Sequence, residues 1–250
     1  MKSINDLKIG TRLNLVFNLA FIVIVGLLGL YTIRSQRNQI IKDTDTRMNE
    51  QVNDLATIIT DQISQRQKST ENSLRICENE ILGTGRFTSG NQTISIEAKN
   101  QETNEVSQVQ LKKVDINGMG LYNTEKTLDK VTELTGSVAS ILQRIPQGYV
   151  RIATTIKQND GNRSINTYIP NDSPVTKALD NGEVFYGRAI VLGEWYLTAY
   201  KPYKLADGTV VVLSTGNIEK DMTSLKGYFN EKKYFNTGYP FLVDKSGTLV

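Results

Sequence analysis

The sequence predicts an α+β protein that begins with a membrane-spanning helix, continues as one long helix and then forms a mainly antiparallel sheet. The segment Leu13–Ile33 contains no charged residue. No glycine or proline lies between Tyr31 and Leu82, which favours an unbroken helix. After Gly85, short runs of alternating apolar and polar residues replace the helical spacing, and such runs predict strands. A long helix followed by consecutive strands is typical of an α+β layout rather than of a doubly wound sheet.

The uncharged segment Leu13–Ile33 is long enough to cross a bilayer, which takes about 20 apolar residues. A soluble helix of this length would keep a polar face. A cleaved signal peptide would have a shorter apolar run, followed by a cleavage site of small residues. We therefore predict an uncleaved membrane anchor. Basic residues lie on both sides of the segment, so the positive-inside rule leaves its orientation open.

The next predicted element is a helix over residues 34–82. Apolar residues recur there at spacings of three, four or seven, which places them on one stripe of a helix. The stripe consists of Ile41, Met48, Val52, Leu55, Ile59 and Ile63. At about 1.5 Å per residue, this helix would be roughly 70 Å long. A coiled coil with a second chain and packing against the chain's own domain both fit the stripe, and we expect a combination of the two.

The residues that follow are predicted to form a sheet with two short helices. The alternating runs include residues 91–100 and 106–116, and the helical spacing returns at residues 124–136 and 173–182. The last of these helices has a serine cap at Ser173, a proline in its first turn at Pro174 and a glycine stop at Gly182.

The composition excludes several classes of function. The chain has no histidine, which removes Ser-His-Asp and Cys-His catalysis and most zinc sites. Its one cysteine, Cys77, has no partner for an internal disulfide. The net charge of +3 comes without a block of basic residues, so there is no electrostatic footprint for a nucleic acid. We expect no catalytic residue, no metal, no cofactor and no nucleic-acid partner, and we expect this part of the chain not to be an enzyme.

The stretch FYGRAIVLGEWYLTAYKP, residues 185–202, places one arginine among five aromatic residues. We expect a hairpin with a two-residue loop at Gly193-Glu194, so that Leu192 lies opposite Trp195 and Arg188 opposite Ala199. Strand alternation then divides the side chains between two faces. One face carries Tyr186, Arg188, Trp195 and Leu197, and the other carries Tyr196, Thr198 and Tyr200.

The arginine of this hairpin allows two interpretations. Its guanidinium could bind a carboxylate or phosphate through two parallel hydrogen bonds, in a pocket with aromatic walls. Alternatively, Arg188 pairs with Glu183 or Glu194 at the surface, and the aromatic residues belong to the core.

Two stretches of the sequence resemble known families. Residues 159–218, from NDGNRSINTYIP to STGNI, resemble an extracytoplasmic Cache sensor domain. The opening LKIGTRLNLVF, Leu7–Phe17, resembles the start of many bacterial methyl-accepting chemotaxis proteins. The resemblance implies a PAS-like sensor module, a cytoplasmic N-terminus and a periplasmic remainder anchored in the bacterial inner membrane.

In related sensors the ligand lies between the central sheet and the strand that leads to a proline. By position, this implies that Trp195, Thr198 and Tyr200, just before Pro202, contact the ligand. Arg188 and Tyr186 complete the predicted site on the hairpin, and Arg151 and Tyr168 are added from the preceding strands. The amino-acid-binding signature of other Cache receptors is absent as a full set, so the sequence does not name the ligand.

The sequence also predicts a second module. Residues 237–250 are predicted to form a strand, a turn and the start of another strand, and the predicted long helix is long enough for two stacked modules. We expect a cytoplasmic N-terminus, a span, a long periplasmic helix, a membrane-distal Cache module and the start of a truncated membrane-proximal Cache module. Their respective ranges are 1–12, 13–33, 34–82, 83–225 and 226–250.

These observations favour a homodimeric transmembrane chemoreceptor that binds a small extracellular ligand, such as a carboxylate or an amino acid. The ectodomain of a sensor histidine kinase or of a diguanylate cyclase fits equally well, because the output domain would lie beyond residue 250. A membrane-anchored structural protein is the remaining alternative.

Overall fold

The structure is a computed structural model that describes residues 8–83, 85–124, 126–158 and 160–219, together with residues 233, 238, 239 and 241. The chain divides into two compact units, Met1–Thr60 and Asp61–Val250. The second module predicted for residues 226–250 lies almost entirely outside the described residues.

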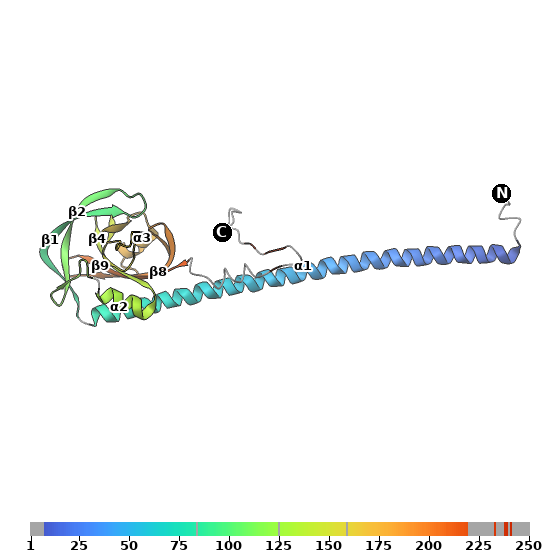
Figure 1. The fold of residues 1–250 in the computed structure, drawn as a ribbon, viewed down its shortest axis with the longest axis horizontal. Coiled ribbons are helices and arrows are strands. Elements are labelled where there is room, and N and C mark those ends of the chain that lie inside the picture. Colours follow the sequence, from blue (N-terminus) through green and yellow to red (C-terminus); the bar gives the residue numbers. More distant parts are fainter. Residues whose placement is uncertain are drawn as a thin grey trace. The chain divides into compact units, whose positions relative to one another are not determined.

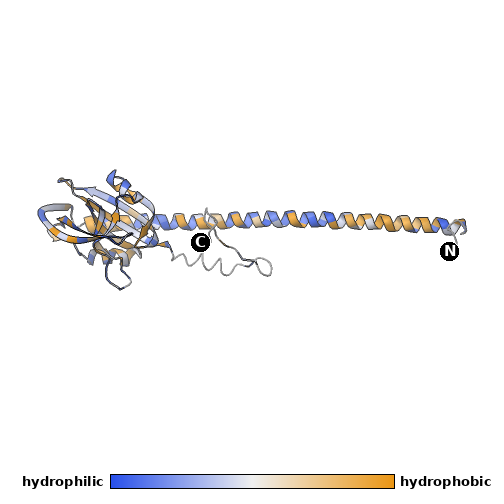
Figure 2. Ribbon diagram, turned by 90° about the horizontal axis from the view of Figure 1, so that it is seen from above, coloured by the Kyte–Doolittle hydropathy of each residue, from blue (hydrophilic) through white to orange (hydrophobic). Residues whose placement is uncertain are grey.

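The first unit consists of the N-terminal part of α1, a helix of 74 residues from Ile9 to Leu82. By length and composition, α1 is the one described helix that could cross a membrane, and its apolar segment lies near the N-terminus. Figure 2 shows the hydrophobic colouring concentrated in this part of the helix. A candidate span near the N-terminus agrees with the sequence, and the bounds Leu13–Ile33 stay a prediction.

The second unit is built on a nine-stranded sheet with the order β3-β2-β1-β6-β5-β4-β9-β8-β7 (Figure 1). All neighbouring strands are antiparallel except β1 and β6, which are parallel. The predicted α+β class with a mainly antiparallel sheet is confirmed. The strands are β1 Phe87–Asn100, β2 Val106–Ile116, β3 Met119–Gly120, β4 Val138–Ile145, β5 Gly148–Thr154, β6 Thr167–Pro170, β7 Phe185–Val191, β8 Glu194–Lys204 and β9 Val210–Ile218.

Helices cover both faces of this sheet (Figure 1). The C-terminal part of α1 and helix α2, Lys126–Thr135, bury their apolar residues in a core cluster with inward residues of β1, β2, β4, β5 and β9. Helix α3, Pro174–Asp180, packs on the other face against residues of β5, β8 and β9. The predicted Ser173 cap is confirmed, since its side chain accepts a hydrogen bond from the backbone N–H of Val175.

A polar network fixes α1 to strand β9. Thr215 Oγ1 donates to the carbonyl oxygen of Thr70 at 3.0 Å, and Asn217 Nδ2 donates to Thr70 Oγ1 at 2.9 Å. Ser137 Oγ connects Asn217 Oδ1, at 3.0 Å, with Ser73 Oγ, at 2.8 Å. Because these groups are largely buried, each hydrogen bond replaces water that the interface excludes. The network therefore fixes the register of α1 on the sheet.

The predicted register of the β7–β8 hairpin was wrong by two residues. Ile190, not Leu192, lies opposite Trp195, and Arg188 lies opposite Leu197. The loop consists of Leu192 and Gly193, which have φ angles of 53° and 84°. Positive φ at both central residues is the requirement of a type I′ turn, so Leu192 belongs to the loop and not to the strand. A shift of two residues preserves the faces, and the predicted division of side chains between them holds.

Candidate ligand-binding site

Arg151 occupies the interior of the sheet, on the face covered by α3. The side chain extends from β5, in the middle of the strand order, and only 1% of the residue is exposed. Its Nη1 donates to Thr167 Oγ1 at 3.0 Å, and its Nη2 donates to Gln101 Oε1 at 2.9 Å. Both acceptors are uncharged. Their positions follow from the topology, because β6 pairs with β5 and β1 pairs with β6.

The guanidinium of Arg151 has no carboxylate partner among the residues that the structure describes. Burial lowers its pKa, and interaction with Tyr200 opposes that shift. An arginine nevertheless remains protonated in a protein, so the interior holds a positive charge. A buried charge without a counter-charge is costly. The site is therefore complementary to an anion.

Residues from β4, β8 and β9 surround Arg151 on this face. Tyr200 is buried, and burial raises the pKa of its hydroxyl, an effect that the nearby Arg151 opposes. Thr198 is also buried and donates to the carbonyl oxygen of Gly187 at 2.9 Å. A small cavity of about 10 Å³ remains between these side chains, which is space for about one water molecule. Its walls include Val138, Ser140, Arg151, Val191, Tyr196, Thr198, Tyr200, Ser214 and Gly216.

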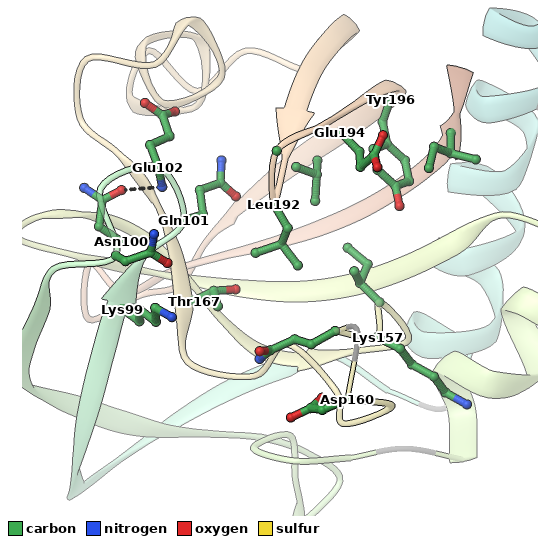
Figure 3. A pocket seen from close by; sticks show the side chains of 16 residues that line it. Lys99, Asn100, Gln101, Glu102, Lys157, Asp160, Thr167, Leu192, Glu194 and Tyr196 are labelled. Atoms are coloured by element: carbon green, nitrogen blue, oxygen red, sulfur yellow. Dashed lines mark hydrogen bonds between the residues drawn. The ribbon is translucent and has the colours of Figure 1, made fainter. Parts of the chain in front are cut away.

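A larger cavity of about 710 Å³ adjoins the small one, and the two share Ile156, Val191 and Tyr196 as lining residues (Figure 3). This volume lies in the range of small-molecule sites. Gln101 and Thr167, the two acceptors of Arg151, line the larger cavity. They therefore separate its interior from the guanidinium.

The rim of the larger cavity carries charges of both signs. Its cationic side chains are Lys99 and Lys157, and its anionic side chains are Glu102, Asp160 and Glu194. Figure 3 shows these five side chains among those that line the cavity. Because Arg151 lies behind Gln101 and Thr167, a ligand with a carboxylate at one end and a polar or cationic group at the other fits this distribution of charge.

The turn that presents Gln101 is fixed locally. Asn100 ends β1, and its Oδ1 accepts hydrogen bonds from the backbone N–H groups of Glu102 at 2.8 Å and Thr103 at 3.3 Å. Figure 3 shows the first of these bonds. The backbone N–H of Gln101 donates to the carbonyl oxygen of Tyr168 at 3.1 Å. An asparagine that bonds the backbone two residues ahead is typical of tight turns.

Comparison with known proteins identifies the family of this fold. The family model of the Cache 3/Cache 2 fusion domain matches residues 34–250. The chain belongs to the Cache 3/Cache 2 fusion domain family. No curated protein matches the chain. A Cache domain together with a candidate N-terminal membrane helix fits an extracellular sensor.

The Cache domain places Arg188 on the opposite face of the hairpin from Thr198 and Tyr200. The Arg188 side chain is 55% exposed and forms an ion pair with Glu219, with an Nη2–Oε2 distance of 2.7 Å. Its guanidinium carbon lies 4.4 Å from the centre of the Trp195 ring. The hydrogen bond to Glu219 raises the pKa of Arg188. The alternative partners expected from the sequence, Glu183 and Glu194, are not the ones that the structure provides.

The predicted site residues thus separate into distinct places in the Cache domain. Arg151, Thr198 and Tyr200 come together around the small cavity. Tyr186 and Trp195, 49% and 46% exposed, lie on the outward face with Arg188. All three lie outside the two cavities around Arg151, although Arg188 and Trp195 line a separate cavity of about 250 Å³, and their contact with a ligand stays a prediction.

Tyr168 lies on the other face of the sheet from Arg151. It pairs with Val150 and belongs to the core cluster beneath α1 and α2. Its neighbour Thr167 is the residue of β6 that lines the larger cavity, and contact of Tyr168 with a ligand stays a prediction.

Sequence reasoning missed Gln101 and Thr167 and did not select Tyr196. Tyr196 was on the predicted face with Thr198 and Tyr200, so strand alternation was a signal that could have found it. Gln101 follows a strand end and carries no local signal. Within the described residues, no group of three histidine, cysteine, aspartate or glutamate side chains could hold a metal ion.

Proposed function

We propose that the chain is the sensing part of a transmembrane chemoreceptor that binds a small extracellular carboxylate, amino acids included, on Arg151. The observation that carries this proposal is the buried guanidinium without a described carboxylate partner, next to a cavity of about 710 Å³. A ligand carboxylate would supply the missing counter-charge, and its two oxygens could accept two parallel hydrogen bonds from the guanidinium.

The connection between the cavity and α1 supports a signalling role. Ser214 and Gly216 of β9 line the small cavity, and Thr215 and Asn217 of the same strand bond to Thr70 of α1. Alternate side chains of one strand therefore serve the ligand site and the helix. A ligand that binds one position of β9 more tightly than another would shift α1 with it, because only a difference in affinity between two states biases an equilibrium.

The proposed orientation has a cytoplasmic N-terminus and a sensor domain outside the bacterial inner membrane. A cysteine introduced at Ser3 and one introduced at Asn171 test this in intact cells, because a membrane-impermeant maleimide reaches only external thiols. Labelling at position 171 alone is expected, and labelling at position 3 alone would reverse the orientation. Cys77 is buried, and burial raises the pKa of its thiol to about 12, so it stays unlabelled in the folded chain.

We expect the first unit to pair with a second copy of the chain along its exposed apolar stripe. Ile41, Met48 and Val52 are 50%, 43% and 60% exposed. Oxidation of a Met48→Cys variant in membranes is expected to give a disulfide-linked dimer, whereas Lys42→Cys is the matched control on the same helix. Equal crosslinking at both positions would argue against this stripe as the dimer contact.

A thermal-shift measurement of the full chain in detergent micelles tests the ligand class. Acetate, L-lactate, succinate and L-alanine are compared with their amides, which lack the carboxylate, at constant ionic strength. A ligand at one hundred times its dissociation constant adds about 2.7 kcal/mol of stability, enough to shift the midpoint by a few degrees. Stabilisation by an acid and not by its amide is expected, and equal effects of both would contradict an anion site.

The second candidate function is the ectodomain of a sensor kinase or of a cyclase. The same cavity and the same helix would serve either output. The chain can be fused to a chemoreceptor signalling domain, and the swimming response to the stabilising acid can then be measured. A response would support coupling to chemotaxis, and its absence would favour a kinase or cyclase output.

A further inference from the structure

Access to Arg151 from the larger cavity is restricted. Arg151 lines the small cavity but not the larger one, whereas Gln101 and Thr167 line the larger one. The small cavity, at about 10 Å³, holds about one water molecule and is too small for a carboxylate. A ligand carboxylate therefore reaches the guanidinium only after a side chain between the two cavities moves.

Gln101 is the side chain that would have to move, because its amide oxygen occupies an acceptor position on Arg151. It is 9% exposed, and both ends of its amide are engaged. Oε1 accepts from Arg151 Nη2 at 2.9 Å, and Nε2 donates to the carbonyl oxygen of Ile190 at 3.0 Å. The amide orientation is defined by chemistry, because only the carbonyl oxygen can accept from a guanidinium and only the nitrogen can donate to a carbonyl.

These bonds connect three parts of the domain. Gln101 belongs to the turn after β1, Arg151 to β5 and Ile190 to β7, which is the terminal strand of the sheet order. The Leu192-Gly193 loop between β7 and β8 lines the larger cavity, and Figure 3 shows Leu192 near Gln101. Through Ile190, Gln101 therefore holds the hairpin that forms part of the cavity wall.

We propose that Gln101 is a ligand-displaced gate whose amide oxygen occupies the position that the ligand carboxylate takes on Arg151. The inference rests on the proposed function of Arg151. A carboxylate replaces a neutral acceptor with a charged one, and this exchange favours the ligand. Displacement of Gln101 also breaks its bond to Ile190, which removes one of the contacts that hold the terminal strand β7 in place. An uncharged amide ligand would exchange one neutral acceptor for another and gains nothing, so the gate selects acids over their amides.

Two substitutions at the same position give opposite expected results. Gln101→Ala removes the competing acceptor, and the dissociation constants of the acids are expected to fall about five- to tenfold, the equivalent of one net hydrogen bond. Gln101→Glu places a carboxylate of the chain itself on Arg151, and acid binding is expected to weaken at least tenfold. Gln108→Ala, which truncates an exposed glutamine of β2 that lines neither cavity, is the matched control and leaves the affinity unchanged.

The experiment is isothermal titration of acetate, L-lactate, succinate and L-alanine, with their amides, into the full chain and the variants in detergent micelles. Hydrogen exchange of residues 185–200 is measured with and without the tightest acid, and faster exchange in the bound state is expected. A purely structural Gln101 would give weaker binding in both variants and unchanged exchange in the hairpin. That result would overturn the gate and leave the proposed function intact, whereas a wild-type chain that binds none of the acids would overturn the proposed function itself.

Discussion

Two arginines of the sensor domain have opposite environments. Arg151 is 1% exposed and bonds uncharged acceptors, whereas the Arg188 side chain is 55% exposed, pairs with Glu219 and lies over Trp195. Arg188 is conspicuous in the sequence because its aromatic neighbours are close along the chain. Arg151 is inconspicuous, because its neighbours come from other strands. An arginine that is already paired with an acid at the surface gains little from a ligand anion. A buried arginine without an acidic partner gains a counter-charge from it.

The largest expected effect belongs to Arg151→Met, which removes the charge and keeps an apolar chain of similar length. Ligand-dependent stabilisation, about 2.7 kcal/mol at one hundred times the dissociation constant, is expected to vanish. Thermal unfolding with and without the acid measures it, and a cooperative transition without ligand shows that the variant folds. Full retention of the acid response in this folded variant would remove the basis of the comparison.

Thr198→Val tests how much a buried hydrogen bond on the inner face of the hairpin contributes to stability. Valine matches the shape of threonine but leaves the carbonyl oxygen of Gly187 without its donor, so a loss of about 1–2 kcal/mol is expected. Urea unfolding measures the loss. Thr88→Val, which removes an exposed bond of 3.3 Å to the carbonyl oxygen of Asp115, is the matched control and is expected to cost less. Equal losses at the two positions would show that burial of Thr198 contributes nothing.

Arg188→Ala tests the exposed member of the pair. An exposed ion pair and a cation–π contact each contribute at most about 1 kcal/mol, so the variant is expected to lose little stability and to keep its full response to the acid. Chemical unfolding and ligand titration of the same sample measure both quantities. Loss of the response would restore the role that the sequence predicted for Arg188.

The smallest expected effect is the pH dependence of the ion pair between Glu78 of α1 and Lys201 of β8, 2.6 Å apart. Burial opposes ionisation of Glu78, but its hydrogen bond to Lys201 and further interactions outweigh burial and lower its pKa. The stability from this pair is therefore present above the unfolded pKa of about 4.3 and is lost as pH falls through the lower folded value. The free-energy difference between wild type and Glu78→Gln, well under about 1 kcal/mol for a solvent-screened pair, is expected to disappear below that range. A difference that grows on acidification would contradict this sign.

The sequence was sufficient for features that depend on local pattern. The uncharged stretch near the N-terminus predicted a helix that could cross a membrane, and alternation predicted the faces of the β7–β8 hairpin. The cap at Ser173 followed from its residue type and from Pro174 after it. Each of these features is determined by residues within a few positions of one another.

The features that could not be predicted from the sequence depend on backbone angles or on long-range pairing. The hairpin register failed because Leu192 adopts a positive φ that a leucine rarely takes. The placement of Thr167, rather than Tyr168, beside the larger cavity depends on the pairing of β5 with β6, which is not visible in one sequence. Gln101 reaches Arg151 across fifty positions of sequence, and only the parallel pairing of β1 with β6 brings it there.

The most direct test of the anion site is an experimental structure of the chain with the tightest acid of the panel. We expect the ligand carboxylate within hydrogen-bonding distance, about 3 Å, of the Arg151 guanidinium, with Gln101 turned away from it. A carboxylate bound at Arg188 and Trp195, with Arg151 still bonded to Gln101 and Thr167, would contradict it.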